Sequence, residues 1–206
     1  MESPGSLDAP ATAVVVVPVK AFDRAKGRLA GRLDDAERAA LARTLAEVVL
    51  GAAHPLPAAV VCDDEGVADW ARAAGAAVVW APGTDLNGSV SAAVGRLEGA
   101  GVGRAVVTHA DLPFARGLAG LAAAGEDEVL LVADRHGDGT NVLSVPTGRG
   151  FRFHYGPGSC AAHRDEAARC GLEVRMIDDD HLAWDVDAPE DLDPPAELGP
   201  FPGVLR

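Results

Sequence analysis

The feature that most constrains this chain is a repeated alternation of apolar, β-branched runs with segments of helical periodicity. The first run, residues 13–19, ends at Lys20 and is apolar throughout, which is typical of a strand buried on both faces. Asp34 then precedes Glu37 by three residues, a pairing that favours the start of a helix. Leucine and valine residues recur at helical spacing after it. The pattern predicts parallel strands joined by helices.

The same alternation continues for most of the 206 residues, a length that fits about one domain. Further strands are expected at 58–62, 76–80, 104–108, 128–133, 142–145 and 173–177, and helices at 69–74, around 90–97, around 118 and at 159–170. We expect a single α/β domain over residues 13–192, with a mostly parallel sheet flanked by helices. Residues 1–12 and 193–206 are expected to be loosely ordered tails.

The charge balance argues against polyanionic partners. The net charge is −13 and aromatic residues make up only 4%, so neither nucleic acid nor an anionic membrane surface is an expected partner. The longest purely apolar stretch, residues 13–17, is far shorter than the ~18 residues of a membrane span. No signal-peptide pattern precedes it, and three cysteines without CxxC spacing are typical of a reduced compartment. We therefore expect a cytoplasmic protein.

Lysine is rare in this chain, and its placement is informative. Sixteen of the eighteen basic residues are arginine, and the two lysines, Lys20 and Lys26, both follow the first predicted strand. A lysine ammonium is a compact point charge that suits phosphate oxygens. With so few lysines, chance also accounts for the pairing.

Isolated carboxylates follow predicted strands. Asp111 comes directly after a buried strand, and Asp185 and Asp187 would point to the same side of an extended segment. Such oxygen ligands suit Mg²⁺. Alternatively, Asp185 and Asp187 cap a short helix that starts near Pro189, and the spacing alone favours neither interpretation. The run at 178–180 is expected to be a solvated turn.

The polar clusters fall where open α/β sheets bind ligands, beyond the carboxyl ends of the strands. No P-loop, dinucleotide fingerprint, HExxH or GxSxG pattern is present. The six histidines are scattered and are more typical of surface or hydrogen-bonded polar positions than of metal ligands.

Several short motifs, in order along residues 13–192, carry a family resemblance. They are PVK at 18–20, AKGRL at 25–29, DLN at 85–87, ADLP at 110–113, DGTN at 138–141, FHYGPGS at 153–159 and WDVDAPEDL at 184–192. Together they resemble the guanylyltransferases of coenzyme F-420 biosynthesis, which act on phosphoenolpyruvate or 2-phospho-lactate. The resemblance implies a single-domain nucleotidyltransferase fold that is GT-A-like and Rossmann-like. Relatives such as the molybdopterin guanylyltransferases open with a glycine-rich loop, which PVKAFDRAKGRL replaces here.

The resemblance also implies residue roles. Metal binding, by two Mg²⁺ ions, falls to Asp111, Asp185 and Asp187. Nucleotide binding falls to Lys20, Lys26 and Asn87, and catalysis to Lys20, Lys26, Arg28 and Asp111. Binding of the acid's carboxylate falls to Thr140, Gly156 and Ser159. Independently of the resemblance, Ser159 stands at the start of a predicted helix, where free backbone amides favour binding of an anion. Alternatively, Ser159 is only the N-cap of that helix.

The expected reaction transfers GMP from GTP to the phosphate of phosphoenolpyruvate, giving enolpyruvoyl-2-diphospho-5′-guanosine and pyrophosphate. The attacking phosphate oxygen is already ionised, so catalysis needs positioning and charge neutralisation rather than a general base. The Arg- and Ala-rich composition resembles the bacterial branch of the family and favours phosphoenolpyruvate over 2-phospho-L-lactate or 3-phosphoglycerate. A GT-A glycosyltransferase and a non-catalytic acidic module that binds metal or protein are the alternatives. Beyond the two small-molecule substrates, a downstream transferase of the same pathway is the partner considered.

Overall fold

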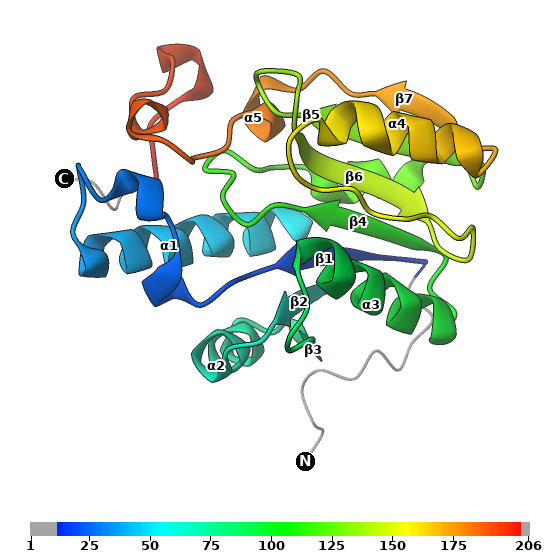
Figure 1. Ribbon diagram of the computed structural model, residues 1–206, viewed down its shortest axis with the longest axis horizontal. Coiled ribbons are helices and arrows are strands. Elements are labelled where there is room, and N and C mark those ends of the chain that lie inside the picture. The colour runs from blue at the N-terminus through cyan, green and yellow to red at the C-terminus, as the bar shows by residue number, and fades with distance from the viewer. Residues whose placement is uncertain (1–11, 203–206) are drawn as a thin grey trace.

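The computed structural model describes residues 12–202 and contains one seven-stranded sheet (Figure 1). Its strands are β1 (Ala13–Pro18), β2 (Ala58–Cys62), β3 (Ala77–Trp80), β4 (Arg104–Thr108), β5 (Glu128–Ala133), β6 (Thr140–Pro146) and β7 (Glu173–Met176). They are ordered β3-β2-β1-β4-β6-β5-β7. Strand β6 runs antiparallel to β4 and β5, and the other pairs are parallel. The expectation of a mostly parallel α/β sheet is confirmed.

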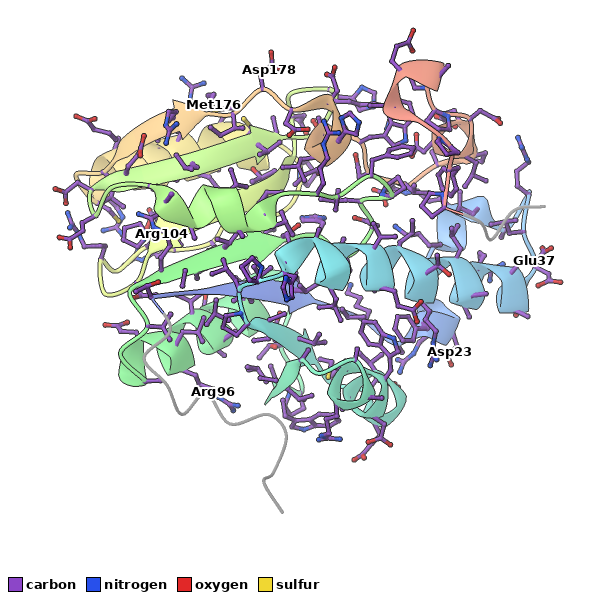
Figure 2. All side chains as sticks on the ribbon, turned by 180° about the vertical axis from the view of Figure 1, so that it is seen from behind. Asp23, Glu37, Arg96, Arg104, Met176 and Asp178 are labelled. Carbon is purple, nitrogen blue, oxygen red and sulfur yellow. The ribbon has the colours of Figure 1, made fainter. Side chains whose placement is uncertain are left out.

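Helices cover both faces of the sheet. They are α1 (Asp35–Ala53), α2 (Glu65–Ala73), α3 (Leu86–Gly99), α4 (Ser159–Arg169) and α5 (Asp180–Ala183). In β1, Val14 and Val16 pack in the cluster that includes α3 and α4, whereas Val15 and Val17 pack in the cluster that includes α1 and α2. Figure 2, seen from behind, shows α1 in front of the sheet. Burial on both faces explains why the first run is apolar throughout.

Helix α1 begins as the sequence predicts. The Asp34 carboxylate accepts a hydrogen bond from the Glu37 backbone N–H at 2.8 Å, and the Glu37 carboxylate accepts one from the Asp34 backbone N–H at 2.9 Å. This reciprocal capping satisfies two backbone donors that a helix start leaves unpaired, and a capping side chain contributes about 1 kcal/mol.

Two expected segments differ in the structure. The helix around Leu118 is a 3-10 helix, Leu118–Ala123, in which Leu118 and Leu121 are buried three residues apart, as three residues per turn requires. The expected solvated turn at 178–180 is exposed at Asp178 and Asp180 but also contains a helix cap. The Asp179 carboxylate accepts from the backbone N–H groups of His181 and Leu182 and so begins α5.

The C-terminal segment is packed as far as it is described. After residue 192 the chain forms a 3-10 turn, Ala196–Leu198, and Phe201 lies against a small apolar cluster that includes Leu29 and Val186. Of the expected tails, 1–12 and 193–206, residues 1–11 and 203–206 lie outside the described residues. None of the helices within 12–202 is both long enough and apolar enough to cross a membrane.

Candidate active site

A cleft of about 920 Å³ opens at the carboxyl ends of β1 and β4, a volume within the usual range of small-molecule sites. These two strands are neighbours in the sheet although β2 and β3 lie between them in the sequence. From β1 the chain passes to β2, on one side of β1, and later returns to β4, on the other side of β1. The strand order thus reverses between β1 and β4, and open α/β sheets bind ligands at such a point. Nine of the ten candidate residues line the cleft: Lys20, Lys26, Arg28, Asp111, Thr140, Gly156, Ser159, Asp185 and Asp187.

Lys26 lies at the centre of the charged end of the cleft. Its Nζ is 2.6 Å from Asp111 Oδ2 and 3.6 Å from Asp187 Oδ1, and it donates to the Val186 carbonyl at 2.5 Å. Within residues 12–202 Lys26 is the one residue other than glycine with a positive φ, 56°. That backbone conformation costs about 1–2 kcal/mol for a residue with a Cβ. The strain is offset by the ammonium contacts, so the loop after β1 is held in place by this side chain.

Electrostatics around Lys26 keep the pair charged. Burial alone lowers the pKa of Lys26, but the charge and hydrogen bond of Asp111, with Asp187 and Asp185 beyond it, outweigh burial and raise that pKa. For Asp111, burial raises the pKa, but Lys26 and His109 outweigh it and lower it overall. The pKa of Asp185 is raised by burial and by the charges of Asp111 and Asp187.

The charged end of the cleft carries an excess of negative charge. Three carboxylates, Asp111, Asp185 and Asp187, surround one buried ammonium, and Arg28 reaches Asp187 at 3.5 Å from a largely exposed position. No group of three or more His, Cys, Asp or Glu side chains in the described chain stands ready to hold a metal ion. The oxygen donors nevertheless suit a hard divalent cation, and Asp111 Oδ1 is buried without a hydrogen-bond partner.

The segment that carries Asp185 and Asp187 is fixed by Asp191. The Asp191 side chain is 2% exposed, and its carboxylate accepts hydrogen bonds from the backbone N–H groups of Asp187 (2.6 Å) and Ala188 (2.7 Å). These bonds precede the 3-10 helix Pro189–Leu192. The capping role considered for Asp185 and Asp187 is therefore performed by Asp191.

Arg135 supports the same segment from the loop after β5. It forms an ion pair with Asp191, donates to the Asp185 carbonyl at 3.3 Å, and stacks 4.4 Å from the centre of the Trp184 ring. Sequence reasoning did not single out Arg135 or Asp191. The sequence feature that could have identified Asp191 is its position in the first turn of a helix that starts with Pro189.

A hydroxyl pair lies at the other end of the cleft. Thr140 begins β6 and Ser159 begins α4; each is 2% exposed, and their hydroxyl oxygens are 3.3 Å apart. The N-cap of α4 is Gly158, with a φ of 73°, a conformation that favours glycine. Ser159 is thus the first helical residue, and its hydroxyl performs no capping.

The backbone amides at the start of α4 are used within the chain. Gly158 N–H donates to the Asp138 carboxylate at 2.9 Å, Ser159 N–H to the Gly156 carbonyl at 3.1 Å, and Cys160 N–H to the Asp138 carbonyl at 2.9 Å. Three of the amides that the helix start was expected to offer an anion at Ser159 are therefore already hydrogen-bonded within the chain. The Thr140 hydroxyl, which accepts from the Ser159 hydroxyl at 3.3 Å, is a donor available at this end.

Asn87 is placed differently from the expectation of a nucleotide ligand. Its amide nitrogen donates to the Tyr155 carbonyl at 3.1 Å, and its amide oxygen accepts from the Tyr155 backbone N–H at 2.6 Å. Both ends of the amide are thus used, and Asn87 is absent from the cleft lining. It fastens the segment around Tyr155 to α3.

Several polar groups along the cleft have no partner within the described chain. Lys20 is exposed and makes no ion pair there, and Tyr155 Oη and His109 Nε2 are buried without hydrogen bonds. Burial raises the pKa of Tyr155, so its phenol stays a neutral donor. Buried polar groups are nearly always paired, so these atoms favour a polar ligand in the cleft.

Comparison with known proteins gives concordant matches. A family model described as "Guanylyl transferase CofC like" matches residues 13–195. A phosphoenolpyruvate guanylyltransferase of Conexibacter woesei is 34% identical over 193 residues, which cover 89% of this chain and 86% of that protein. One of Streptomyces coelicolor is 37% identical over 203 residues, covering 91% and 92%. A crystal structure described as a nucleotide-diphospho-sugar transferase from Desulfovibrio desulfuricans covers 88% of this chain and 85% of its own, with a TM-score of 0.68 at 19% identity, and thus shares the fold.

Proposed function

This chain belongs to the CofC-like guanylyl transferase family, and from that premise we propose that it transfers GMP from GTP to the phosphate of phosphoenolpyruvate. The products are the diphosphate-linked guanosine adduct and pyrophosphate. Relatives at 34% and 37% identity carry the name phosphoenolpyruvate guanylyltransferase, which supports this acid over 2-phospho-L-lactate and 3-phosphoglycerate. The CofC family name supports a role in coenzyme F-420 biosynthesis, and the next enzyme of that pathway is the partner that we propose.

One observation carries the proposal: a single cleft joins a carboxylate cluster around Lys26 to a pair of buried hydroxyls at Thr140 and Ser159. The first end suits phosphates neutralised by cations, and the second suits a small carboxylate. A phosphorylated acid and a nucleoside triphosphate therefore fit side by side in this cleft.

At the charged end, the transferred group is stabilised by positive charge. Lys26, Lys20 and Arg28 border the cleft there, and we assign them to the triphosphate and to the charge that develops as pyrophosphate leaves. Asp111, Asp185 and Asp187 would hold Mg²⁺, two ions in our proposal, which supplies neutralisation and orientation of phosphate oxygens when bound. With cations on these carboxylates, Lys26 would be available to contact the phosphates.

At the other end, the acid's carboxylate is held away from the cations. Thr140 offers a hydroxyl donor, which Ser159 orients by donating to Thr140 Oγ1 at 3.3 Å. Gly156 leaves the backbone open to close approach of a ligand because it has no Cβ. The phosphate of the acid then points toward the charged end. Its oxygen attacks the α-phosphorus of GTP in line, without a general base, because it is already ionised.

The direct test is incubation of the protein with GTP, Mg²⁺ and phosphoenolpyruvate, followed by measurement of pyrophosphate release and of the new diphosphate by phosphorus NMR. We expect both signals, and weaker ones with 2-phospho-L-lactate, 3-phosphoglycerate or ATP in place of the proposed substrates. Turnover of a sugar nucleotide without pyrophosphate would instead favour a glycosyltransferase. Absence of turnover with every acid would overturn the proposal.

The proposed substrates also indicate the cellular compartment in which the reaction takes place. Phosphoenolpyruvate and GTP are cytosolic metabolites, so we propose that the protein acts in the cytoplasm. Its three cysteines, Cys62, Cys160 and Cys170, are free thiols, as expected in a reducing compartment.

A further inference from the structure

His163 is a fully buried polar residue that the proposed mechanism does not use. It lies on α4 one turn after Ser159, has no exposed surface, and packs edge-to-face against the Tyr155 ring at 4.9 Å between centres. Burial, aided by the charges of His154 and His109, lowers the pKa of His163 to about 4. The imidazole is therefore neutral at physiological pH and carries one proton.

The backbone decides which nitrogen carries that proton. The His154 backbone N–H donates to His163 Nε2 at 2.9 Å, so Nε2 must present its lone pair. The proton is accordingly on Nδ1, which lies 3.0 Å from Thr140 Oγ1. An imidazole in this tautomer donates to the threonine hydroxyl and cannot accept from it.

The donor at Nδ1 determines what the Thr140 hydroxyl can do. A hydroxyl oxygen accepts through two lone pairs and donates one hydrogen. Thr140 Oγ1 accepts from His163 Nδ1–H at 3.0 Å and from the Ser159 hydroxyl at 3.3 Å. Both acceptor positions are then filled, and the hydrogen of Thr140 is left to point away from both partners. Thr140 lines the cleft, where that hydrogen meets an acceptor on a ligand.

We propose that His163 is a positioning residue, which fixes the Thr140 hydroxyl as a hydrogen-bond donor toward the carboxylate of the phosphorylated acid. The identity of that ligand rests on the proposed function; the direction of the hydrogen-bond chain rests on the contacts of His163 alone. The chain runs from the backbone of His154 through the imidazole to Thr140, and it selects an acceptor-only group at this end of the cleft.

Two substitutions separate this role from packing, because each keeps one of the two imidazole contacts. The side-chain nitrogen of His163→Asn falls near Nδ1 and retains a donor to Thr140, whereas the carbonyl of His163→Gln reaches the position of Nε2 and retains only the acceptor for His154. We expect His163→Gln to raise KM for phosphoenolpyruvate about three- to tenfold, as for one hydrogen bond, with KM for GTP nearly the same. His163→Asn should restore most of that loss.

The Thr140→Val background provides the matched control. There the hydroxyl is gone, so His163→Gln should add no further increase in KM for phosphoenolpyruvate. Equal increases from the Asn and Gln variants, or an increase from Gln that persists with Thr140→Val, would overturn the positioning role and leave a packing residue.

A spectroscopic readout keeps this inference apart from the proposed function. Nitrogen-15 NMR of the imidazole in the free protein should show His163 neutral, with the proton on Nδ1. A proton on Nε2 overturns the inference, whatever the enzyme assay gives. Absence of pyrophosphate release by the wild-type protein overturns the proposed function. The NMR result still shows which nitrogen of His163 carries the proton.

Discussion

Lys26 Nζ and Asp111 Oδ2 lie 2.6 Å apart, across a sequence separation of 85 residues. The two side chains leave the sheet after its adjacent parallel strands β1 and β4, and both are buried, with side-chain exposures of 9% and 19%. Each charge lowers the free energy of the other in its charged form, so the pair is stable only when both are ionised. The Lys26 ammonium thus lies between the carboxylates of Asp111 and Asp187, which would otherwise repel each other.

Removing the ammonium should damage both stability and turnover. We expect Lys26→Met to lower the free energy of unfolding by about 3–5 kcal/mol, as when a buried ion pair loses one partner, measured by urea denaturation at pH 7. Because Lys26 is also assigned to the leaving pyrophosphate, kcat should fall and not only KM for GTP rise. The double variant Lys26→Met with Asp111→Asn should recover part of the stability; a rise in KM alone would make Lys26 a binding residue and favour Lys20 for the chemistry.

The carboxylate of Asp111 is expected to be essential for turnover, while Asp111→Asn lowers stability but leaves the protein folded. Asp111→Asn removes one negative charge with almost no change of volume, so we expect loss of pyrophosphate release with near-native circular dichroism. Asp185→Asn should be similarly severe. The control is Asp179→Asn, since Asp179 caps α5 and does not line the cleft, and asparagine caps equally well. Near-normal activity of the Asp111 variant at saturating Mg²⁺ would remove it from the proposed metal site.

Local patterns explain why much of the fold is predictable from the sequence. The valines of β1 alternate between two buried faces, so an unbroken apolar run predicts a central parallel strand. Asp34 and Glu37 form their reciprocal bonds within four residues, and such short-range pairs are visible in the sequence. Asp111 stands out because a lone carboxylate follows a buried strand. These features depend on neighbours close along the chain or on the shared edge of a sheet.

The features that sequence reasoning missed depend on distant backbone groups. The Asn87 side chain donates a hydrogen bond to the Tyr155 carbonyl, 68 residues away. Asp138 accepts hydrogen bonds from the Gly158 and Cys160 backbone N–H groups at the start of α4. His163 gains its role from the backbone N–H of His154, whose direction follows from the path of an irregular segment. A residue type alone does not reveal which backbone groups its side chain will bind, so the contacts of Asn87 with Tyr155 were not predictable from the sequence.

The hydroxyl of Ser159 should contribute to binding of the acid with little effect on folding. Gly158, not Ser159, is the N-cap of α4, so Ser159→Ala should change the free energy of unfolding only slightly. The Ser159 hydroxyl donates to Thr140 Oγ1 at 3.3 Å and so orients the Thr140 donor; loss of one such hydrogen bond costs about 0.5–1.5 kcal/mol, which raises KM for phosphoenolpyruvate about three- to tenfold. KM for GTP serves as the internal control. Equal losses for both substrates would place the carboxylate elsewhere in the cleft.

Acid should destabilise the protein through His163. The pKa of His163 is about 4 in the folded state and 6.5 when unperturbed. Between these pH values His163 binds a proton in the unfolded chain but not in the folded chain. Stability from the neutral imidazole is therefore complete above about pH 6.5 and is lost as pH falls toward 4. The loss amounts to at most about 3 kcal/mol, at 1.36 kcal/mol for each pH unit.

The measurement is urea denaturation of the wild type and of His163→Asn at intervals from pH 7.5 to pH 4. The difference in unfolding free energy should favour the wild type most at high pH and shrink as pH falls, because the variant has no imidazole to protonate. Glu166, whose pKa is lowered to about 2 chiefly by its hydrogen bond with Arg169, weakens both proteins alike below about pH 4.5, so it cancels in the comparison. A difference independent of pH would mean that His163 titrates normally, and thus that its ring is not locked in the neutral form between His154 and Thr140.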